Sequence, residues 1–351
     1  MAPACLRIWQ CQTETVQSLS AAGAILTSTI SSDGALLSGS PRRDKAKDAT
    51  GGLLRVMGPR GVLVIKDVTS ILSMDRNTRG AVLAALREIH DGRWQRNVGT
   101  DGGRTLGWRG RIAVIGAVAT AWDRAHDVIA SMGDRFVVLR MVSTTGRMAA
   151  GRQAIRNTGD EVARRAQLAE SVADVLSTVS TEDAIELTDL ERDRILSAAD
   201  VVALCRTGVD YDYRGDVIDA HAPEMPTRLA KQLAQVLRGA VAIGLDRSAG
   251  LRLALRCARD SMRPLRMVIL DDVAANPGAR TIEVRRRLNK PRNTVDRQLQ
   301  AQHMLGVSSC EEVEEGSRGS SWYYRVATTI DPDVLNVPDL LLPIKNKREE
   351  E

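Results

Sequence analysis

One short stretch near the C-terminus concentrates residue types that contact nucleic acid. Between Arg280 and Arg297 the chain has seven basic residues and only two acidic ones, Glu283 and Asp296. The basic residues are Arg280, Arg285, Arg286, Arg287, Lys290, Arg292 and Arg297. Clustered Lys and Arg form the electrostatic footprint of a nucleic-acid-binding domain. The cluster predicts DNA contact, whereas the net charge of +5 for the whole 351-residue chain is too modest to predict it alone.

The chemistry of base recognition depends on a helix that begins at Asn293. Its period places Val295 and Leu299 on the inner face, and the outward residues near its N-terminal end are Asn293, Thr294, Arg297 and Gln298. That end of a recognition helix meets base edges, and Arg, Asn and Gln pair with bases bidentately. Lys290 and Arg292 are placed for phosphate contacts, which position the protein without specifying sequence. Arg318, in the loop EEGSRGSS, is predicted to enter a minor groove.

The elements around this helix follow a recognisable order. We expect helices at 265–275, 281–288 (with Thr281 as N-cap) and 293–304, then strands at 307–314 and 321–326 joined by a Gly/Ser turn. The order of helices, turn and hairpin is that of a winged helix-turn-helix domain. Asp271 and Asp272 are expected on a solvated face. A winged helix that contacts protein is the alternative, and the acidic run 311–315 favours it.

A second set of candidate residues follows two apolar runs. Val62–Ile65 and Ile112–Val118 are short and β-branched, which is typical of buried strands in a parallel sheet. Ligands bind at the carboxyl ends of such strands, where Lys66-Asp67 and Thr120 lie. A carboxylate such as Asp67 suits Mg²⁺. The alternative is a surface Asp that follows a buried strand.

The remaining segments supply the frame for these residues. We expect a helix at 76–90 preceded by Asp75, a hairpin from 93–98 and 104–108 in which Trp94 and Trp108 pack together, and a last strand at 136–141. From about 146 to 259 the period is helical. The expected helices lie at 160–179, 189–206, 227–242 and 246–260.

Residues 10–260 resemble an AAA+ P-loop ATPase of the MoxR and MCM-like branch. The resemblance makes VLVIKD (62–67) the Walker B motif, DGRWQRNVGTDGGRTLGWRG (91–110) the hairpin insertion, and PTRLAKQLAQVLRG (226–239) the sensor-2 helix. It implies that Thr120 is sensor 1, Arg135 in GDRF the arginine finger and Arg228 sensor 2. The C-terminal part resembles the winged-helix domains of ArsR- and MarR-type regulators.

The AAA+ resemblance implies ATP and Mg²⁺ as cofactors and a homo-oligomer formed through the core. Asp67 would be either the metal ligand or the water-orienting base. The sequence departs from the family at two places. Lys66-Asp67 replaces the usual Asp-Glu, and no GxxxxGK[ST] loop is present. The loop's position is occupied by Cys11–Thr15, where Gln12 replaces the phosphate-binding lysine and Thr13 follows it. These departures argue against tight ATP binding and more strongly against hydrolysis.

The sequence therefore predicts an α/β, AAA+-like core with a parallel sheet at 1–145, its N-terminal part truncated or degenerate. An α-helical lid follows at 146–260, then a winged helix (α+β) at 261–330 and a tail at 331–351. We expect a cytoplasmic DNA-binding protein, with double-stranded DNA as partner, that acts in transcription regulation or in handling mobile or replicating DNA. No apolar run has the length of a membrane span. An active, oligomeric AAA+ ATPase and a non-enzymatic assembly subunit are the alternatives.

Overall fold

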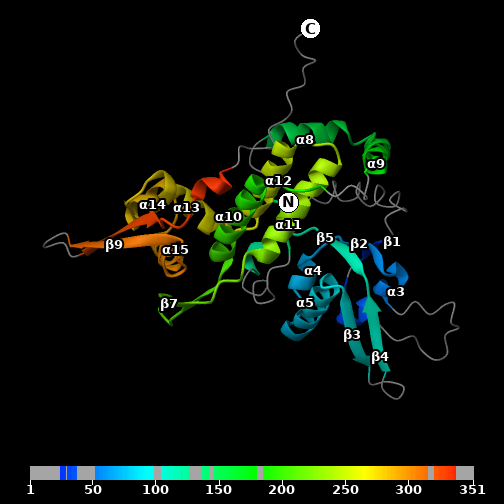
Figure 1. Cartoon of the computed structure of the whole chain (residues 1–351), viewed down its shortest axis with the longest axis horizontal. Helices are drawn as coiled ribbons and strands as arrows, with labels where there is room; N and C mark the ends of the chain where they lie inside the picture. Colours follow the sequence, from blue (N-terminus) through cyan, green and yellow to red (C-terminus); the bar gives the residue numbers. More distant parts are fainter. Residues whose placement is uncertain are drawn as a thin grey trace, which may run out of the picture. The chain divides into compact units, whose positions relative to one another are not determined.

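The computed structural model describes residues 24–28, 30–37, 52–98, 104–119, 121–125, 136–141, 146–179, 185–314 and 320–336. It is a mixed α/β structure, mostly helical with small sheets (Figure 1). The chain divides into two compact units: residues 1–132 with 143–179, and residues 133–142 with 180–351. The predicted division into three domains and a tail stays a prediction.

A parallel sheet forms the centre of the first unit. Its strands β1 (Ala24–Ser28), β2 (Arg60–Ile65) and β5 (Arg111–Gly116) lie in the order β1-β2-β5, and both pairings are parallel. The predicted parallel pairing of the two apolar runs is therefore confirmed. One face of β2 and β5, which includes the buried Leu63 and Ile112, packs into the core of this unit.

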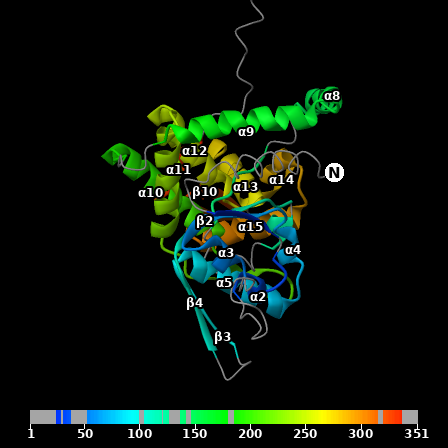
Figure 2. The ribbon, with the colours of Figure 1, turned by 90° about the vertical axis from the view of Figure 1, so that its right-hand side faces the viewer.

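Helix α5 (Arg76–His90) covers this core and begins as predicted. The Asp75 carboxylate accepts hydrogen bonds from the backbone N–H groups of Asn77 and Thr78, which caps the helix. Strands β3 (Arg93–Val98) and β4 (Arg104–Arg109) form the predicted antiparallel hairpin, which extends away from the sheet (Figure 2). Trp94 lies directly opposite Trp108, and both are buried.

Four other described helices of the first unit are short: α2 (Asp33–Leu36), α3 (Leu53–Met57), α4 (Thr69–Leu72) and α6 (Ala121–Arg124). Two are longer, α8 (Arg147–Arg156) and α9 (Glu161–Ser177). Helix α9 confirms the long helix predicted at 160–179. Of the residues described in α8 and α9, none is buried.

The second unit has a helical core. Helices α10 (Asp189–Arg206), α11 (Thr227–Ala242) and α12 (Arg247–Asp260) confirm the predicted helices and pack together through fully buried apolar side chains such as Val202, Leu233 and Ala258. Strands β6 (Val209–Tyr211) and β7 (Val217–Ala220) form a small antiparallel hairpin after α10. The 3-10 helix η3 (Pro332–Leu335) adds Leu335 to the same core.

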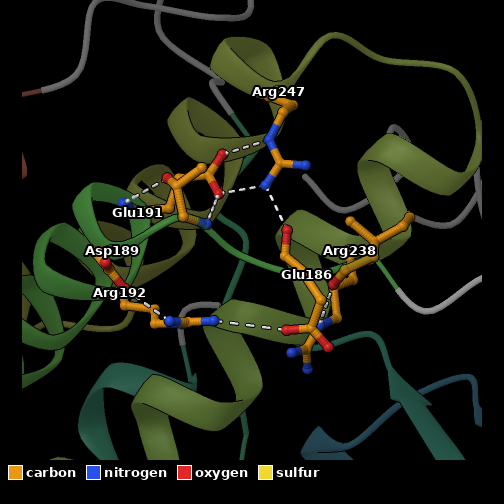
Figure 3. A network of polar contacts seen from close by, with 8 residues as sticks. Glu186, Asp189, Glu191, Arg192, Arg238 and Arg247 are labelled. Carbon is orange, nitrogen blue, oxygen red and sulfur yellow. Dashed lines mark hydrogen bonds and ion pairs between the residues drawn. The ribbon is translucent and has the colours of Figure 1, made fainter.

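A polar network fixes the beginning of α10 (Figure 3). The Thr188 hydroxyl accepts the Glu191 N–H, and the Glu191 carboxylate accepts the Thr188 N–H, which is a reciprocal capping box. Arg247 of α12 donates to both carboxylate oxygens of Glu191 at 2.9 and 2.5 Å, and to the Glu186 carbonyl. The network therefore joins the N-terminal ends of α10 and α12.

The prediction of a strand at 136–141 is wrong. This extended segment belongs to the second unit, and its backbone is bound by side chains rather than by a neighbouring strand. The Val138 N–H donates to Ser261 Oγ at 3.0 Å, and the Arg140 N–H donates to the Asp260 carboxylate at 2.8 Å. The segment thus lies along the junction that follows α12.

The C-terminal part of the second unit has three helices and a small sheet. Its elements are α13 (Pro264–Ala275), β8 (Ala279–Arg280), α14 (Thr281–Leu288), α15 (Arg292–Met304), β9 (Ser308–Glu314) and β10 (Ser320–Val326). The antiparallel sheet has the order β8-β10-β9. Val295 and Leu299 point inward as predicted and pack with the buried Tyr324 of β10.

Two local expectations for this part are wrong. Arg280, not Thr281, occupies the N-cap of α14, and the Thr281 hydroxyl instead donates to Asp296. Asp272 is buried rather than solvated, because Arg287 reaches it from α14. None of the helices in the described part of the chain combines the length and the apolar character that a membrane span requires.

Candidate nucleic-acid interface

The turn between α14 and α15 sets the position of the predicted phosphate contacts. Asn289 ends α14 in the left-handed region at φ 50°, and the Lys290 N–H donates to the Arg285 carbonyl at 3.1 Å. Pro291 then precedes the first residue of α15 and cannot continue α14. Lys290 and Arg292 consequently lie on the surface, where both are exposed.

The first turn of α15 has the exposed polar residues that the sequence predicts. Asn293 and Thr294 are exposed, on the side of the helix away from Val295. Their amide and hydroxyl groups can donate to or accept from base edges or phosphates.

Arg297 and Gln298 were expected to point outward, and this expectation is wrong. Both are half-buried. Arg297 Nη2 donates to the Arg214 carbonyl in the β6–β7 turn at 2.6 Å, and Gln298 Oε1 accepts from Arg266 Nε at 3.2 Å. The reason is that α15 packs against strand β7 of the β6–β7 hairpin and against α13, so one side of the helix is an internal contact.

Arg266 is the centre of that internal contact. Its side chain is 0% exposed and donates to the Cys205 and Thr207 carbonyls at 2.9 and 2.6 Å, where α10 ends. Gln302 of α15 donates to the Arg266 carbonyl at 2.7 Å. A guanidinium that binds the last carbonyls of a helix also interacts favourably with its dipole. Arg266 therefore attaches α13 and α15 to the helical core.

Two of the seven basic residues of the cluster are neutralised within the chain. Arg287 donates to both oxygens of Asp272 at 2.8 and 2.7 Å, and this hydrogen bonding raises the pKa of Arg287. Arg280 pairs with Glu283 at 3.1 Å and also lies over the Tyr323 ring. Arg297 is also engaged within the chain, by the Arg214 carbonyl. The cationic surface is therefore narrower than the sequence suggests, and its members are Arg285, Arg286, Lys290 and Arg292.

The hairpin β9–β10 carries exposed negative charge. Glu311, Glu312 and Glu314 are exposed on β9, and Arg325 lies 3.8 Å from Glu311. Trp322 of β10 is 44% exposed. The predicted minor-groove residue Arg318 lies outside the described residues.

The predicted nucleotide site is only partly described. Asp67 is exposed after β2, and its Oδ1 accepts the Thr69 N–H at 2.9 Å, which helps α4 to begin. Arg228, in the other unit, forms an ion pair with Glu224. Gln12, Thr13, Thr120 and Arg135 lie outside the described residues. The structure therefore does not show these residues as one site.

The donor chemistry at Asp67 fits a limited role for Mg²⁺. Within the described ranges, no group of three His, Cys, Asp or Glu side chains is placed to hold a metal ion. A single exposed carboxylate suits an ion that is held mainly by phosphate oxygens and water, rather than by a protein cage.

Comparison with known proteins adds no relative to this picture. The sequence matches no family model, and it matches no curated protein significantly.

Proposed function

We propose that this chain binds double-stranded DNA through the surface formed by α14, the following turn and the first turns of α15. The element order α13, β8, α14, α15, β9, β10 is that of a winged helix, in which the third helix contacts the major groove. The role would be in transcription regulation or in the handling of mobile or replicating DNA.

The observation that carries the proposal is the uncompensated charge beside α15. Among the described residues, Arg285, Arg286, Lys290 and Arg292 take part in no ion pair, whereas Arg280 and Arg287 do. Arg286, Lys290 and Arg292 are exposed and Arg285 is half-buried, so cations that the fold does not use for its own stability remain available to phosphates. The exposed Asn293 and Thr294 follow at once, so phosphate and base contacts would lie side by side.

The test measures affinity for a fluorescent duplex of mixed sequence at several salt concentrations. Lys290→Ala/Arg292→Ala should weaken binding and reduce the slope of log K against log salt by about two, because each phosphate contact contributes about 0.9. The control Arg152→Ala/Arg156→Ala removes the same charge from the exposed residues of α8. It should leave the slope nearly unchanged. Equal affinity and slope for wild type and Lys290→Ala/Arg292→Ala would overturn the proposal.

A second candidate function is nucleotide binding by the first unit. The observation that favours it is the parallel order β1-β2-β5 with Asp67 at the carboxyl end of the central strand. Binding of a fluorescent ATP analogue with Mg²⁺, compared with Asp67→Ala, tests it. Micromolar binding that the variant loses would support a working AAA+-like core, and Arg135→Ala would then test an oligomeric ATPase. No binding at millimolar nucleotide would refute this function.

A further inference from the structure

Four exposed arginines come together at one end of the first unit's strands. Arg93, the first residue of β3, lies directly opposite Arg109, the last residue of β4. Arg60, the first residue of β2, is the register partner of Arg111, the first residue of β5. Only Gly110 separates Arg109 from Arg111. We call these four residues the arginine patch.

Close backbone contacts hold the three segments of the patch together. The Gly110 N–H donates to the Gly92 carbonyl at 3.0 Å, and the Arg111 N–H donates to the Pro59 carbonyl at 2.7 Å. A Cβ at Gly110 would lie 2.3 Å from that Pro59 oxygen, so only glycine allows this approach. The backbone thus fixes the starting points of all four side chains.

The patch places like charges opposite each other on neighbouring strands. Like charges directly opposite each other on neighbouring strands are destabilising. All four arginines are exposed, and none of them is in an ion pair within the described part of the chain. By contrast Arg96, on the other face of β3, pairs with Asp33 at 3.0 Å. A polyanion would relieve the repulsion that the fold leaves in place.

Among the described strand residues of the hairpin, 93–98 and 104–109, the outward face continues the patch without any acidic residue. Gln95, Asn97, Thr105 and Gly107 are exposed between the arginines and the hairpin turn. Nothing lies within 4 Å of a Cβ built at Gly107, so this face is open. Amides and hydroxyls beside arginines are the groups that contact phosphates and sugars. An extended surface of this kind suits a polymer of phosphodiesters better than a single small anion.

We propose that the arginine patch binds the phosphate backbone of DNA. This contact lies in the first unit and is separate from the α14–α15 surface of the second unit. Contacts at the patch would add affinity without adding sequence specificity, because phosphate contacts carry no sequence information.

The experiment uses the full chain and a fluorescent 40-base-pair duplex, with affinity measured across a salt series. Arg93→Gln/Arg109→Gln should weaken binding and lower the salt slope by about two. Arg152→Gln/Arg156→Gln, on α8 of the same unit, is the matched control and should change the slope by less than one. Because the four positions in the two variants are exposed, circular dichroism should show both variants folded.

The outcomes separate the patch from the α14–α15 surface. Binding that falls in Arg93→Gln/Arg109→Gln but not in the control supports the patch, even if Lys290→Ala/Arg292→Ala has no effect. Binding that falls only in Lys290→Ala/Arg292→Ala overturns the patch and leaves the proposed function standing. An equal loss in the α8 control, or no binding by wild type at low salt, overturns the patch.

Discussion

Replacing Glu191 by Gln removes one charge from the start of α10 and leaves the shape nearly unchanged. Glu191 is buried, and its carboxylate accepts from Arg247 and from the Thr188 N–H. A glutamine keeps one carbonyl oxygen for the capping box but loses the ion pair. The substitution therefore isolates the contribution of charge in the network that joins α10 to α12 (Figure 3).

The magnitude follows from the pKa of the carboxyl group. Hydrogen bonding to Arg247 holds the pKa of Glu191 at about 2, against its ordinary value of 4.5. A depression of this size corresponds to about 3 kcal/mol of free energy of unfolding. The Arg247 side chain is 42% exposed, so solvent screening reduces the expected loss in Glu191→Gln to about 1–2 kcal/mol.

The lowered pKa of Glu191 also fixes the direction in which stability changes with pH. Because the folded-state pKa is lowered, the stabilisation is fully present above about pH 4.5 and is lost as the pH falls through about 2. Thermal unfolding of wild type and Glu191→Gln should differ by about 2–8 °C at pH 7, since 1 kcal/mol shifts a unit of this size by about 2–4 °C. The two curves should converge towards pH 2.

Asp189→Asn is the matched control. Asp189 lies in the same turn and pairs with Arg192 at 2.8 Å, but its side chain is 92% exposed. Its replacement should change stability by less than about 0.5 kcal/mol. Equal effects of the two substitutions at pH 7, or a Glu191→Gln difference that persists at pH 2, would refute the reasoning.

Three other substitutions test the packing within each unit. Arg287→Ala leaves the Asp272 carboxylate buried without its cation, but the Arg287 side chain is 36% exposed and the pair is partly screened, so urea denaturation should show a loss of about 1–2 kcal/mol; no measurable effect would contradict the pair. Gly110→Ala should destabilise the first unit by about 2 kcal/mol or more, measured by tryptophan fluorescence, whereas Gly80→Ala in open space on α5 should be neutral or stabilising by about 1 kcal/mol. Leu299→Ala should cost about 2–5 kcal/mol in thermal unfolding, because the side chain is fully buried; near-wild-type stability would contradict its place in the core.

The sequence predicted those helices and strands that are determined by residues close together in the chain. The apolar runs at 62–65 and 112–118 became parallel neighbours, and Asp75 caps the helix that follows it. The hairpin at 93–109 was also predicted, because alternation and a glycine-rich turn lie within the same short stretch. Helices α10, α11 and α12 agree with the helices expected before residue 260. The helices and the small sheet expected after it correspond to α13, α14, α15, β8, β9 and β10.

The interactions that the sequence did not reveal join distant residues. Arg297 and Arg214 are 83 positions apart, and Arg266 lies 61 positions from Cys205. An arginine on an amphipathic helix is normally expected in solvent, so nothing local indicated that Arg266 is buried. The strand expected at 136–141 failed for the same reason, because side chains from residues 260 and 261 bind its backbone.

The basic residues of this chain indicate a DNA-binding surface only after those in internal ion pairs are set aside. In the second unit the subtraction removes Arg280 and Arg287 and leaves cations beside the first turn of α15. Arg297 is a different case. It keeps its charge but donates to the Arg214 carbonyl, and a hydrogen bond from a charged group contributes about 1.5–3 kcal/mol. Any contact that Arg297 makes with a base must first replace that bond, so the exposed Lys290 and Arg292 carry the larger share of the expected affinity.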